Sequence, residues 1–421
     1  MQPRPHYVLT CPTCAEETED DGHRLRCSGE HEDTLLRTRY RNPDFIPVGD
    51  SDGIFRYRRW LPVGRVLPGA GRPVAYRSER LAAALGLTDL WIAFSGYWPE
   101  RGANLETGTF KELEALTVLA RRPADGPPLV LASAGNTAAA FAAVCSRERV
   151  PAIVLVPGSG LGRLRLRRPL NPCVALVVLD GAEYADCIAL ADLVARRPGV
   201  QAEGGVRNVG RRDGLGTVLL AAYEAMRRLP DRYVQAIGSG AGAIAAHEAA
   251  GRLRSAGTEG RLPRLLLGQN AGFAPVQAAW RGCRPPGPLA DPAGAFADEL
   301  TNRRPPYAVR GGLADVLAES DGDVVVAEAA EARAAMAAFG RLEGIDIEPA
   351  AGVAVACLAR AVRSGRVGPA ETVLLNVTGG GRRRHARDFA LVPAEPVLRL
   401  PAGAVDDPEV PDRIAALCPL P

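Results

Sequence analysis

The chain has 421 residues, and its 51 basic and 48 acidic side chains give a formal net charge of +3. A chain of this length is long enough for two or three domains around a large buried core. The near balance of charge excludes the broad basic surface of a nucleic-acid-binding protein. The sequence has no apolar run of about 18 residues and no apolar signal-peptide core, so we expect a soluble, cytoplasmic protein without membrane contact.

Cysteines mark the first 45 residues as a segment of their own. Cys11 and Cys14 form a Cys-x2-Cys turn that can present two thiolates, and Cys27 with His31 can supply a second arm. Three thiolates and one imidazole are a tetrahedral zinc set, although His23 is an alternative fourth ligand. The other interpretation is a segment with the shape of a zinc ribbon that holds no metal.

Lys111 is the only lysine in the chain, and every other basic side chain is arginine. An amine can lose its proton and attack a carbonyl, whereas a guanidinium stays charged. The lone lysine therefore predicts Schiff-base chemistry, the alternative being chance survival on a surface helix. Thr109 is a plausible N-cap, and Phe110, Leu113 and Leu116 have helical spacing. Lys111 should thus lie in the first helical turn, where the macrodipole disfavours an ammonium.

From residue 129 onward, short apolar runs alternate with helical segments. The runs are continuous rather than alternating in polarity, which indicates strands covered on both faces, as in parallel α/β sheets. We therefore predict an α/β fold with two parallel-sheet domains after the N-terminal segment: a large one over residues 46–128 and 230–421 and a small, mobile one over residues 129–229. The predicted strands are 90–94, 129–132, 152–156, 174–179, 233–237, 265–267, 324–326 and 373–377.

The segment Ser133-Ala-Gly-Asn-Thr137 lies between a predicted strand and a predicted helix. Its small residues leave backbone N–H groups accessible at a helix N-terminus, which is a receptor for a carboxylate or a phosphate. Asn136 adds a side-chain amide that can donate to an oxyanion. Taken alone, the segment is equally consistent with an ordinary capped helix start.

The segment Gly238-Ser-Gly-Ala-Gly-Ala243 repeats this arrangement with more glycine, so its backbone can close around a phosphate. It also fits a dinucleotide-binding turn. Such a site needs an acidic residue after the next strand, and that strand ends Leu267-Gly-Gln-Asn270. A small phosphorylated cofactor is therefore the better interpretation. Thr378, followed by three glycines, places a hydroxyl at the end of the last predicted strand.

The lysine, the Asn136 turn, the glycine cup and the Thr378-Gly end together resemble the fold-type II pyridoxal-phosphate enzymes, the superfamily of tryptophan synthase β, cysteine synthase and threonine synthase. The resemblance implies pyridoxal 5'-phosphate as cofactor, joined to Lys111. It implies that Asn136 contacts the phenolic oxygen of the cofactor and Thr378 its pyridine nitrogen. The cofactor phosphate would lie against Gly238, Ser239, Gly240, Ala241 and Gly242, and the substrate carboxylate against Ser133, Ala134, Gly135 and Thr137.

Further motifs resemble the threonine-synthase branch. Thr107-Gly-Thr-Phe-Lys-Glu112 is similar to its usual Gly-Ser-Phe-Lys-Asp, from which Glu112 departs. Residues 27–31, 94–102 and 110–115 are closer still to the cysteate synthases, a family of threonine-synthase paralogues. This resemblance implies a β-replacement, through an aldimine and an aminoacrylate, in which sulfite displaces the phosphate of O-phospho-L-serine and yields L-cysteate. It also implies a homodimer or a higher homo-oligomer.

The implied reaction involves two anions, the leaving phosphate and the entering sulfite, and cationic side chains are expected to guide them. Arg207, Arg211 and Arg212, in a glycine-rich stretch, are the candidates because arginine matches phosphate geometry, the alternative being surface arginines in a loop. Other activities stay open, namely threonine synthase, phosphoserine sulfhydrylase or another β- or γ-replacement enzyme. An interpretation from a different class is a zinc-ribbon binding protein with a degenerate α/β domain.

Overall fold

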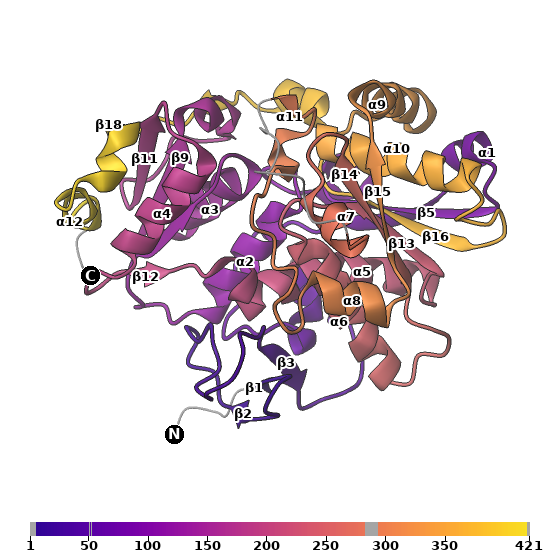
Figure 1. Cartoon of the computed structure of the whole chain (residues 1–421), viewed down its shortest axis with the longest axis horizontal. Coiled ribbons are helices and arrows are strands. Elements are labelled where there is room, and N and C mark those ends of the chain that lie inside the picture. Colours follow the sequence, from indigo (N-terminus) through magenta and orange to yellow (C-terminus); the bar gives the residue numbers. More distant parts are fainter. Residues whose placement is uncertain (1–5, 50, 52, 283–293, 419–421) are drawn as a thin grey trace.

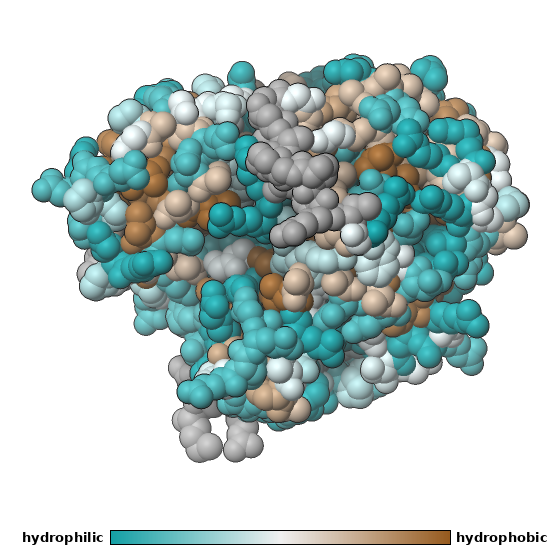
Figure 2. All heavy atoms as spheres, viewed as in Figure 1, coloured by the Kyte–Doolittle hydropathy of each residue, from teal (hydrophilic) through white to brown (hydrophobic). Residues whose placement is uncertain are grey.

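The computed structural model describes residues 6–49, 51, 53–282 and 294–418. Figure 1 shows two lobes, each built around a sheet, with a small N-terminal sheet below them. The face seen in Figure 2 is mostly hydrophilic, with small apolar patches between the charged side chains. None of the described helices is both long and apolar enough to span a bilayer.

The larger sheet has the strand order β15-β14-β13-β16-β5-β4, and all its neighbouring strands are parallel except β4 and β5. Alternate residues of its strands point to opposite faces. Tyr233 and Leu267 pack with one core cluster, and Val234 and Leu266 pack with another. Its strands are β4 (Val74–Ser78), β5 (Asp89–Phe94), β13 (Arg232–Ala236), β14 (Arg264–Asn270), β15 (Asp323–Ala327) and β16 (Thr372–Val377).

Helices cover both faces of this sheet, which explains why its strands are apolar throughout. One face packs against α5 and the other against α10, and these layers continue into α6 and α9. These helices are α5 (Val209–Met226), α6 (Ala241–Ser255), α9 (Ala329–Glu343) and α10 (Pro349–Arg363). The prediction of a parallel α/β sheet buried on both sides is confirmed.

The smaller sheet has the order β12-β8-β9-β11-β18, with parallel pairing throughout. Helix α3 packs on one face, and α4 with α12 packs on the other. The strands are β8 (Leu129–Ala132), β9 (Ala152–Pro157), β11 (Val174–Asp180), β12 (Gln201–Ala202) and β18 (Leu398–Pro401). The helices are α3 (Asn136–Glu148), α4 (Tyr184–Val194) and α12 (Val410–Ala415).

The division of the chain between the two sheets differs from the prediction in two places. Strand β18 belongs to the smaller sheet, where Leu398 pairs with Val177, although residues 230–421 were assigned to the large domain. Helix α5 packs on the larger sheet and against α6, although residues 129–229 were assigned to the small domain. Both differences arise because a short apolar segment carries no local mark of the sheet that it will join.

The N-terminal sheet is antiparallel, with the order β2-β1-β3. It docks on α2 (Lys111–Arg121) and α5 through buried polar contacts. Asp20 accepts hydrogen bonds of 2.7 Å from both Nε and Nη2 of Arg121, and Tyr40 donates to Asp213 at 2.7 Å. Residues 1–5 of the predicted N-terminal segment lie outside the described residues. The strands are β1 (Tyr7–Thr10), β2 (Glu17–Thr18) and β3 (Arg37–Tyr40).

Shorter elements complete the fold around these sheets. Two small antiparallel ladders pair β6 with β7 and β10 with β17. The remaining elements are α1 (Arg80–Leu85), β6 (Tyr97–Trp98), β7 (Ala103–Asn104), β10 (Arg165–Leu166), α7 (Pro275–Trp280), α8 (Leu313–Glu319), α11 (Arg382–Asp388) and β17 (Val392–Pro393).

Candidate active site

A cavity of about 720 Å³ lies between the two sheets and is lined from both of them and from the N-terminal segment. Its wall includes the residues that follow β8, β13 and β16, so the carboxyl ends of parallel strands face the same space. This is the position at which ligands bind in open α/β sheets. Lys111, Asn136, Thr378 and the predicted glycine cup all line this cavity.

Lys111 is the first residue of α2, and its Nζ lies 3.3 Å from Oε2 of Glu114. The backbone of the preceding residue, Phe110, donates to the carbonyl oxygen of Thr378 at 2.8 Å, which fixes the start of α2 beside the end of β16. Burial lowers the pKa of the Lys111 amine and Arg211 adds to this, while the charge of Glu114 acts in the opposite direction. The arrangement holds a desolvated amine at the cavity wall.

Glu114 is a buried carboxylate that joins three parts of the site. It lies three residues after Lys111 on the same face of α2. Its Oε1 accepts hydrogen bonds of 2.9 Å from Thr137 Oγ1 and from Arg211 Nη1. Arg211 also makes a bidentate pair with Glu203. Glu114 is not among the predicted site residues, although its i+3 spacing from the lone lysine is a usable signal.

The segment Ser133–Thr137 curves around the start of α3 and lines the cavity. The backbone N–H of Gly135 donates to Oγ of Ser133 at 3.3 Å. The side-chain amide of Asn136 donates to Oε2 of Glu348 at 2.9 Å, across the gap to the residues beside the larger sheet. Arg382 pairs with the other oxygen of Glu348. Asn136 is therefore held by a contact that bridges the two sheets.

The glycines around the start of α6 are needed for close packing. A Cβ at Gly240, where φ is +75°, would lie 2.6 Å from the side chain of Leu313. A Cβ at Gly242 would lie 2.6 Å from the side chain of Gln235, and one at Gly238 would lie 3.0 Å from the backbone of Leu300. The bare backbone at the N-terminus of a long helix suits a phosphate group. The cradle therefore fits the phosphate of the cofactor that the sequence implies.

The three predicted arginine guides do not share one environment. Arg207 lines the cavity and pairs with Asp33, and Arg211 lines it while paired with two glutamates. Arg212 is absent from the cavity wall among the described residues. Its fully buried guanidinium contacts Glu248 and backbone carbonyls instead. Arg212 therefore cannot reach a ligand in this cavity, and the prediction for it is corrected.

The four predicted metal ligands meet at one point of the N-terminal segment. Ligand atoms of Cys11, Cys14, Cys27 and His31 all lie within 4.8 Å of one another. Cys14 Sγ is 3.6 Å from Cys27 Sγ, and Cys11 Sγ is 3.4 Å from Nε2 of His31. The other ring nitrogen of His31 lies 2.7 Å from the carbonyl oxygen of Glu32, which orients Nε2 toward the thiols.

Three residues of the cavity wall are absent from the predicted site. Leu25 and Arg26 of the N-terminal segment line the cavity beside Arg207. Glu299 also lines it, and burial, followed by the charge of Glu348, raises the pKa of the Glu299 carboxyl. These contacts join residues far apart in sequence, so no local pattern reports them.

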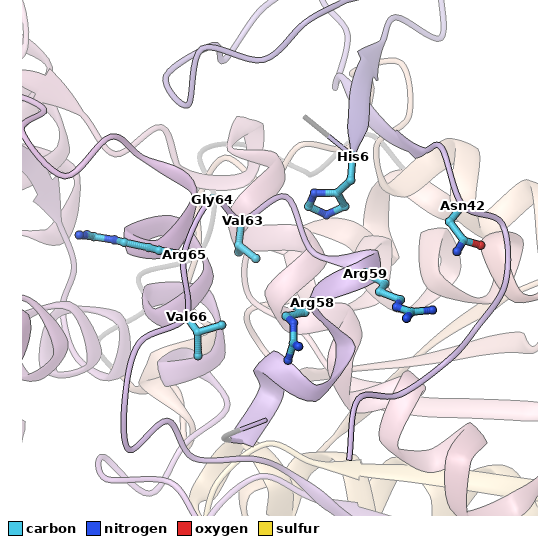
Figure 3. Close-up of a pocket in the computed structure, with 8 residues that line it drawn as sticks. All are labelled: His6, Asn42, Arg58, Arg59, Val63, Gly64, Arg65 and Val66. Atoms are coloured by element: carbon cyan, nitrogen blue, oxygen red, sulfur yellow. The ribbon is translucent and has the colours of Figure 1, made fainter. Parts of the chain in front are cut away.

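A second hollow, of about 400 Å³, lies at the opposite end of α2 (Figure 3). Its wall includes His6, Arg58, Arg59 and Arg65. Arg65 donates to the carbonyl oxygen of Leu119 and so covers the C-terminal end of α2. None of the predicted site residues lines this hollow, which separates it from the candidate active site.

The family model described as pyridoxal-phosphate dependent enzyme matches residues 71–379, which is most of the chain. The chain therefore belongs to the pyridoxal-phosphate-dependent enzymes, and its fold is the fold-type II fold. Its relatives define the branch. It is 43% identical to the cysteate synthase of Methanosarcina acetivorans, over 96% of this chain and 98% of that protein. It is 45% identical to the cysteate synthase of Methanoculleus marisnigri, over 98% of this chain and 97% of that protein.

Solved structures agree on the fold. Maize serine racemase superposes with a TM-score of 0.59 at 17% identity, covering 75% of this chain and 93% of that one. A hydrogen sulfide-producing enzyme from Fusobacterium nucleatum gives a TM-score of 0.54 at 14% identity, covering 75% and 97%. At these identities the likeness establishes the fold alone.

Proposed function

We propose that the protein catalyses the replacement of the phosphate of O-phospho-L-serine by sulfite, which yields L-cysteate and phosphate. The observation that carries this proposal is the identity of 43–45% with cysteate synthases over almost the whole chain. The cavity supports it, because a partly buried amine, a cradle of bare backbone and the segment predicted to bind a carboxylate face one space. Each would be needed for a reaction of an amino acid on pyridoxal phosphate.

The residues of the cavity fit pyridoxal phosphate. Lys111 would hold its aldehyde carbon, Asn136 its phenolic oxygen and Thr378 its ring nitrogen. The bound cofactor supplies an electron sink that weakens the bonds at Cα and Cβ of the amino acid. The Thr378 hydroxyl at this position, in place of a carboxylate, would favour elimination at Cβ over full delocalisation. The phosphate would lie against Gly238, Ser239, Gly240, Ala241 and Gly242.

The chain's own groups supply proton transfer and orientation. The amine of Lys111 takes the Cα proton of the amino acid and later returns it. Glu114 orients that amine, and its contact with Thr137 ties the amine to the carboxylate-binding segment. The C–O bond at Cβ breaks as phosphate leaves with the electron pair, and the sulfur lone pair of sulfite forms the new C–S bond. The hydroxyl of Ser133 and the backbone N–H groups of Ala134, Gly135 and Thr137 would receive the substrate carboxylate, since the Ser133 N–H already donates to the carbonyl oxygen of Leu155.

The arginines divide between charge neutralisation and anion binding. Glu114 and Glu203 surround Arg211, and although burial opposes its charge, these carboxylates raise its pKa. Arg211 therefore stays charged but is already paired, so it holds the site together rather than binding a leaving phosphate. Arg207 shares a single carboxylate, that of Asp33, and is the better anion guide.

We further propose that Cys11, Cys14, Cys27 and His31 hold a zinc ion. Zinc–sulfur bonds of about 2.3 Å in a tetrahedron place two sulfurs about 3.8 Å apart, close to the 3.6 Å between Cys14 and Cys27. Metal analysis of the purified protein should find about one zinc per chain. Cys14→Ser and Cys27→Ser variants should each lose it, and a wild-type protein without metal after zinc-supplemented expression would contradict the proposal.

The activity is tested by offering matched substrates. Purified protein with pyridoxal phosphate receives phosphoserine with sulfite, phosphoserine with sulfide, or phosphohomoserine in water, and products are identified by mass. We expect cysteate from the first mixture as the main product. Threonine from the third mixture without cysteate from the first would favour threonine synthase. Cysteine in preference to cysteate would favour phosphoserine sulfhydrylase.

A further inference from the structure

The N-terminal segment closes one side of the active-site cavity. Leu25 and Arg26 line the cavity, although they precede Lys111 by more than 80 residues. Leu25 packs onto Gly204, where φ is +94° and a Cβ would overlap the leucine side chain. Glycine at this position thus lets the segment lie flat against the cavity wall. The contact therefore depends on the leucine of the N-terminal segment and on the glycine of the cavity wall.

Arg26 belongs to a charge cluster at this side of the cavity. Arg207 makes a bidentate pair with Asp33, with Nη1 2.6 Å from Oδ1, and Arg26 Nη1 lies 3.7 Å from the same oxygen. Two guanidinium groups thus share one carboxylate, which leaves one positive charge in excess. The Arg26 side chain is 68% exposed, so its guanidinium is accessible to a ligand.

The other charges of the cavity wall do not offer the same surplus. Arg211 is matched by two glutamates. Asp298 pairs with Arg163, and burial raises the pKa of Glu299, which favours its neutral form. Arg304 also lines the cavity, and no ion pair joins it to Asp192 or to another described residue. Beside the N-terminal segment, the positive excess comes from two arginines that share one carboxylate.

Two of the candidate metal ligands lie between Arg26 and Asp33, in the segment that carries these charges. Cys27 directly follows Arg26, and His31 precedes Asp33 by two residues. A metal bound by these two ligands together with Cys11 and Cys14 would tie both ends of the segment to the turn after β1. Cys11 is buried in the core, whereas Cys14 is exposed and Cys27 partly so, so apolar packing holds only one side of this cluster. The position of Arg26 would then depend on the metal.

We infer that the N-terminal segment is part of the substrate-binding site, in which Arg26 acts with Arg207 on the oxyanion group of a substrate, and that the metal centre of Cys11, Cys14, Cys27 and His31 holds Arg26 in place. The ligand chemistry is a tetrahedral or pyramidal oxyanion, which both the phosphate of phosphoserine and sulfite provide. The inference rests on the proposed function for the presence of anionic substrates. It assigns the metal centre a role in binding rather than in the chemical step.

The test compares wild type, Arg26→Ala, Cys14→Ser and the double variant as full-length proteins with cofactor bound. Titration with O-phospho-L-serine or L-serine is followed by cofactor absorbance, and metal content is measured on the same samples. We expect Arg26→Ala to keep its metal and to weaken phosphoserine binding about five- to tenfold, with L-serine unaffected. Cys14→Ser should lose metal and show the same selective loss. The double variant should be no weaker than either single variant, because one contact is lost in all three.

A second arm measures the KM for sulfite in the same variants, which distinguishes the two anions. A rise for sulfite alone would assign Arg26 to the entering anion, and a rise for phosphoserine alone would assign it to the leaving one. Arg39→Ala is the matched control, because Arg39 lies on β3 of the same segment, pairs with Glu17 and does not line the cavity. Its binding constants should equal those of wild type.

Three outcomes would overturn the inference: unchanged phosphoserine and sulfite constants in Arg26→Ala, an equal loss for L-serine, or a metal-free Cys14→Ser with wild-type binding. If Cys14→Ser fails to fold, chelation of the wild-type metal followed by zinc addition makes the same comparison. Failure of the proposed function shows separately, as wild-type protein that forms no cysteate. The binding comparison between phosphoserine and L-serine does not depend on that product.

Discussion

Helix α2 has an ion pair at each end, and the pair at the C-terminal end is fully buried whereas the one at the N-terminal end is partly exposed. At the C-terminal end, Arg121 and Asp20 are joined by two hydrogen bonds of 2.7 Å, and their side chains are 1% and 0% exposed. At the N-terminal end, Lys111 makes one contact of 3.3 Å with Glu114, and the lysine side chain is 18% exposed. The first pair is fully satisfied, and the second leaves its amine free to react.

The pKa shifts of Arg121 and Lys111 differ in the same way as their contacts. Burial opposes the charge of Arg121, but the hydrogen bonds and charge of Asp20 raise its pKa above the ordinary value. Burial lowers the pKa of Lys111, and the charges of Glu114 and Glu203 do not reverse the shift. A buried pair with matched hydrogen bonds anchors the N-terminal segment, whereas an under-paired amine suits chemistry that needs its neutral form. One helix thus combines a structural end and a reactive end.

The largest expected effect follows from removing the reactive amine. Lys111→Ala should lower the rate of cysteate formation at least about 10³-fold, and Lys111→Arg should do the same because a guanidinium does not lose its proton. Product is measured by mass, and cofactor retention by absorbance after gel filtration. A Lys111→Arg protein with wild-type turnover would show that the amine is not required.

Removing the ion pair at the C-terminal end of α2 should lower the stability of the protein. Asp20→Ala leaves the charge of Arg121 buried without its carboxylate, although hydrogen bonds to Asn208 and to the carbonyl oxygen of Arg24 remain, and the free energy of unfolding should fall by about 3–5 kcal/mol. Urea denaturation measures the change. The control is Glu17→Ala in the same segment, whose pair with Arg39 is half exposed, at 48% and 52%, and should contribute about 0–1 kcal/mol. Equal losses in the two variants would remove the contrast.

The next prediction concerns Glu112, a buried carboxyl group beside Lys111 on α2. Burial raises the pKa of its carboxyl to about 7, and its Oε1 has no partner among the described residues. The folded state therefore holds a proton that the unfolded chain, with a pKa of about 4.3, releases, so stability falls as pH rises from about 4.3 to about 7. Glu112→Gln should remove this slope and raise stability at pH 8 by about 1–3 kcal/mol.

This prediction is checked by denaturant midpoints at pH 5 and pH 8 for both proteins. The variant should gain on wild type at the higher pH only. A constant difference between the two pH values would mean that Glu112 is ionised throughout the range.

The smallest expected effect concerns Glu114. Glu114→Gln removes the charge that favours the ammonium form of Lys111, so the pKa of the amine should fall further. The amine attacks the cofactor aldehyde only when neutral, so cofactor uptake by the apoprotein should speed up with pH, with a midpoint at lower pH in the variant. Turnover should fall about tenfold because the amine loses its orientation.

Absorbance during cofactor uptake, recorded across a pH series, gives both midpoints for Glu114→Gln. Glu106→Gln is a control, since Glu106 pairs with Arg147 and does not line the cavity. A variant midpoint at higher pH than wild type would contradict the role given to Glu114.

Local patterns were sufficient for most strands of the larger and the smaller sheet, though not for β4, β12 and β18, and they placed the predicted turns at the cavity. The expected strand at residues 129–132 is β8 itself, and the turns after β8 and β13 lie where the small residues and glycines indicated. These features depend on neighbouring residues, which is why periodicity and turn composition report them. The roles of Asn136, Thr378 and the glycine cup stay predictions that the shared cavity supports.

The different environments of Arg211 and Arg212 could not be predicted from the local sequence. The two residues are adjacent and of the same type, and successive residues on a helix point about 100° apart. One therefore reaches the cavity and the other lies in the core beside Glu248. The choice depends on how α5 is rotated against α2 and α6, which no pattern within the segment specifies.

The sequence by itself determined the chemistry of this protein: a single amine on a helix start, strand-to-helix turns shaped for anions, and a cysteine set suited to a metal. Only the tertiary structure decided which groups meet. It joined Glu114 to Thr137 and Arg211, laid Leu25 and Arg26 along the cavity, and added β18 to the smaller sheet. Reactive groups are properties of residues and their neighbours, whereas their partners are set by packing between segments far apart in the chain.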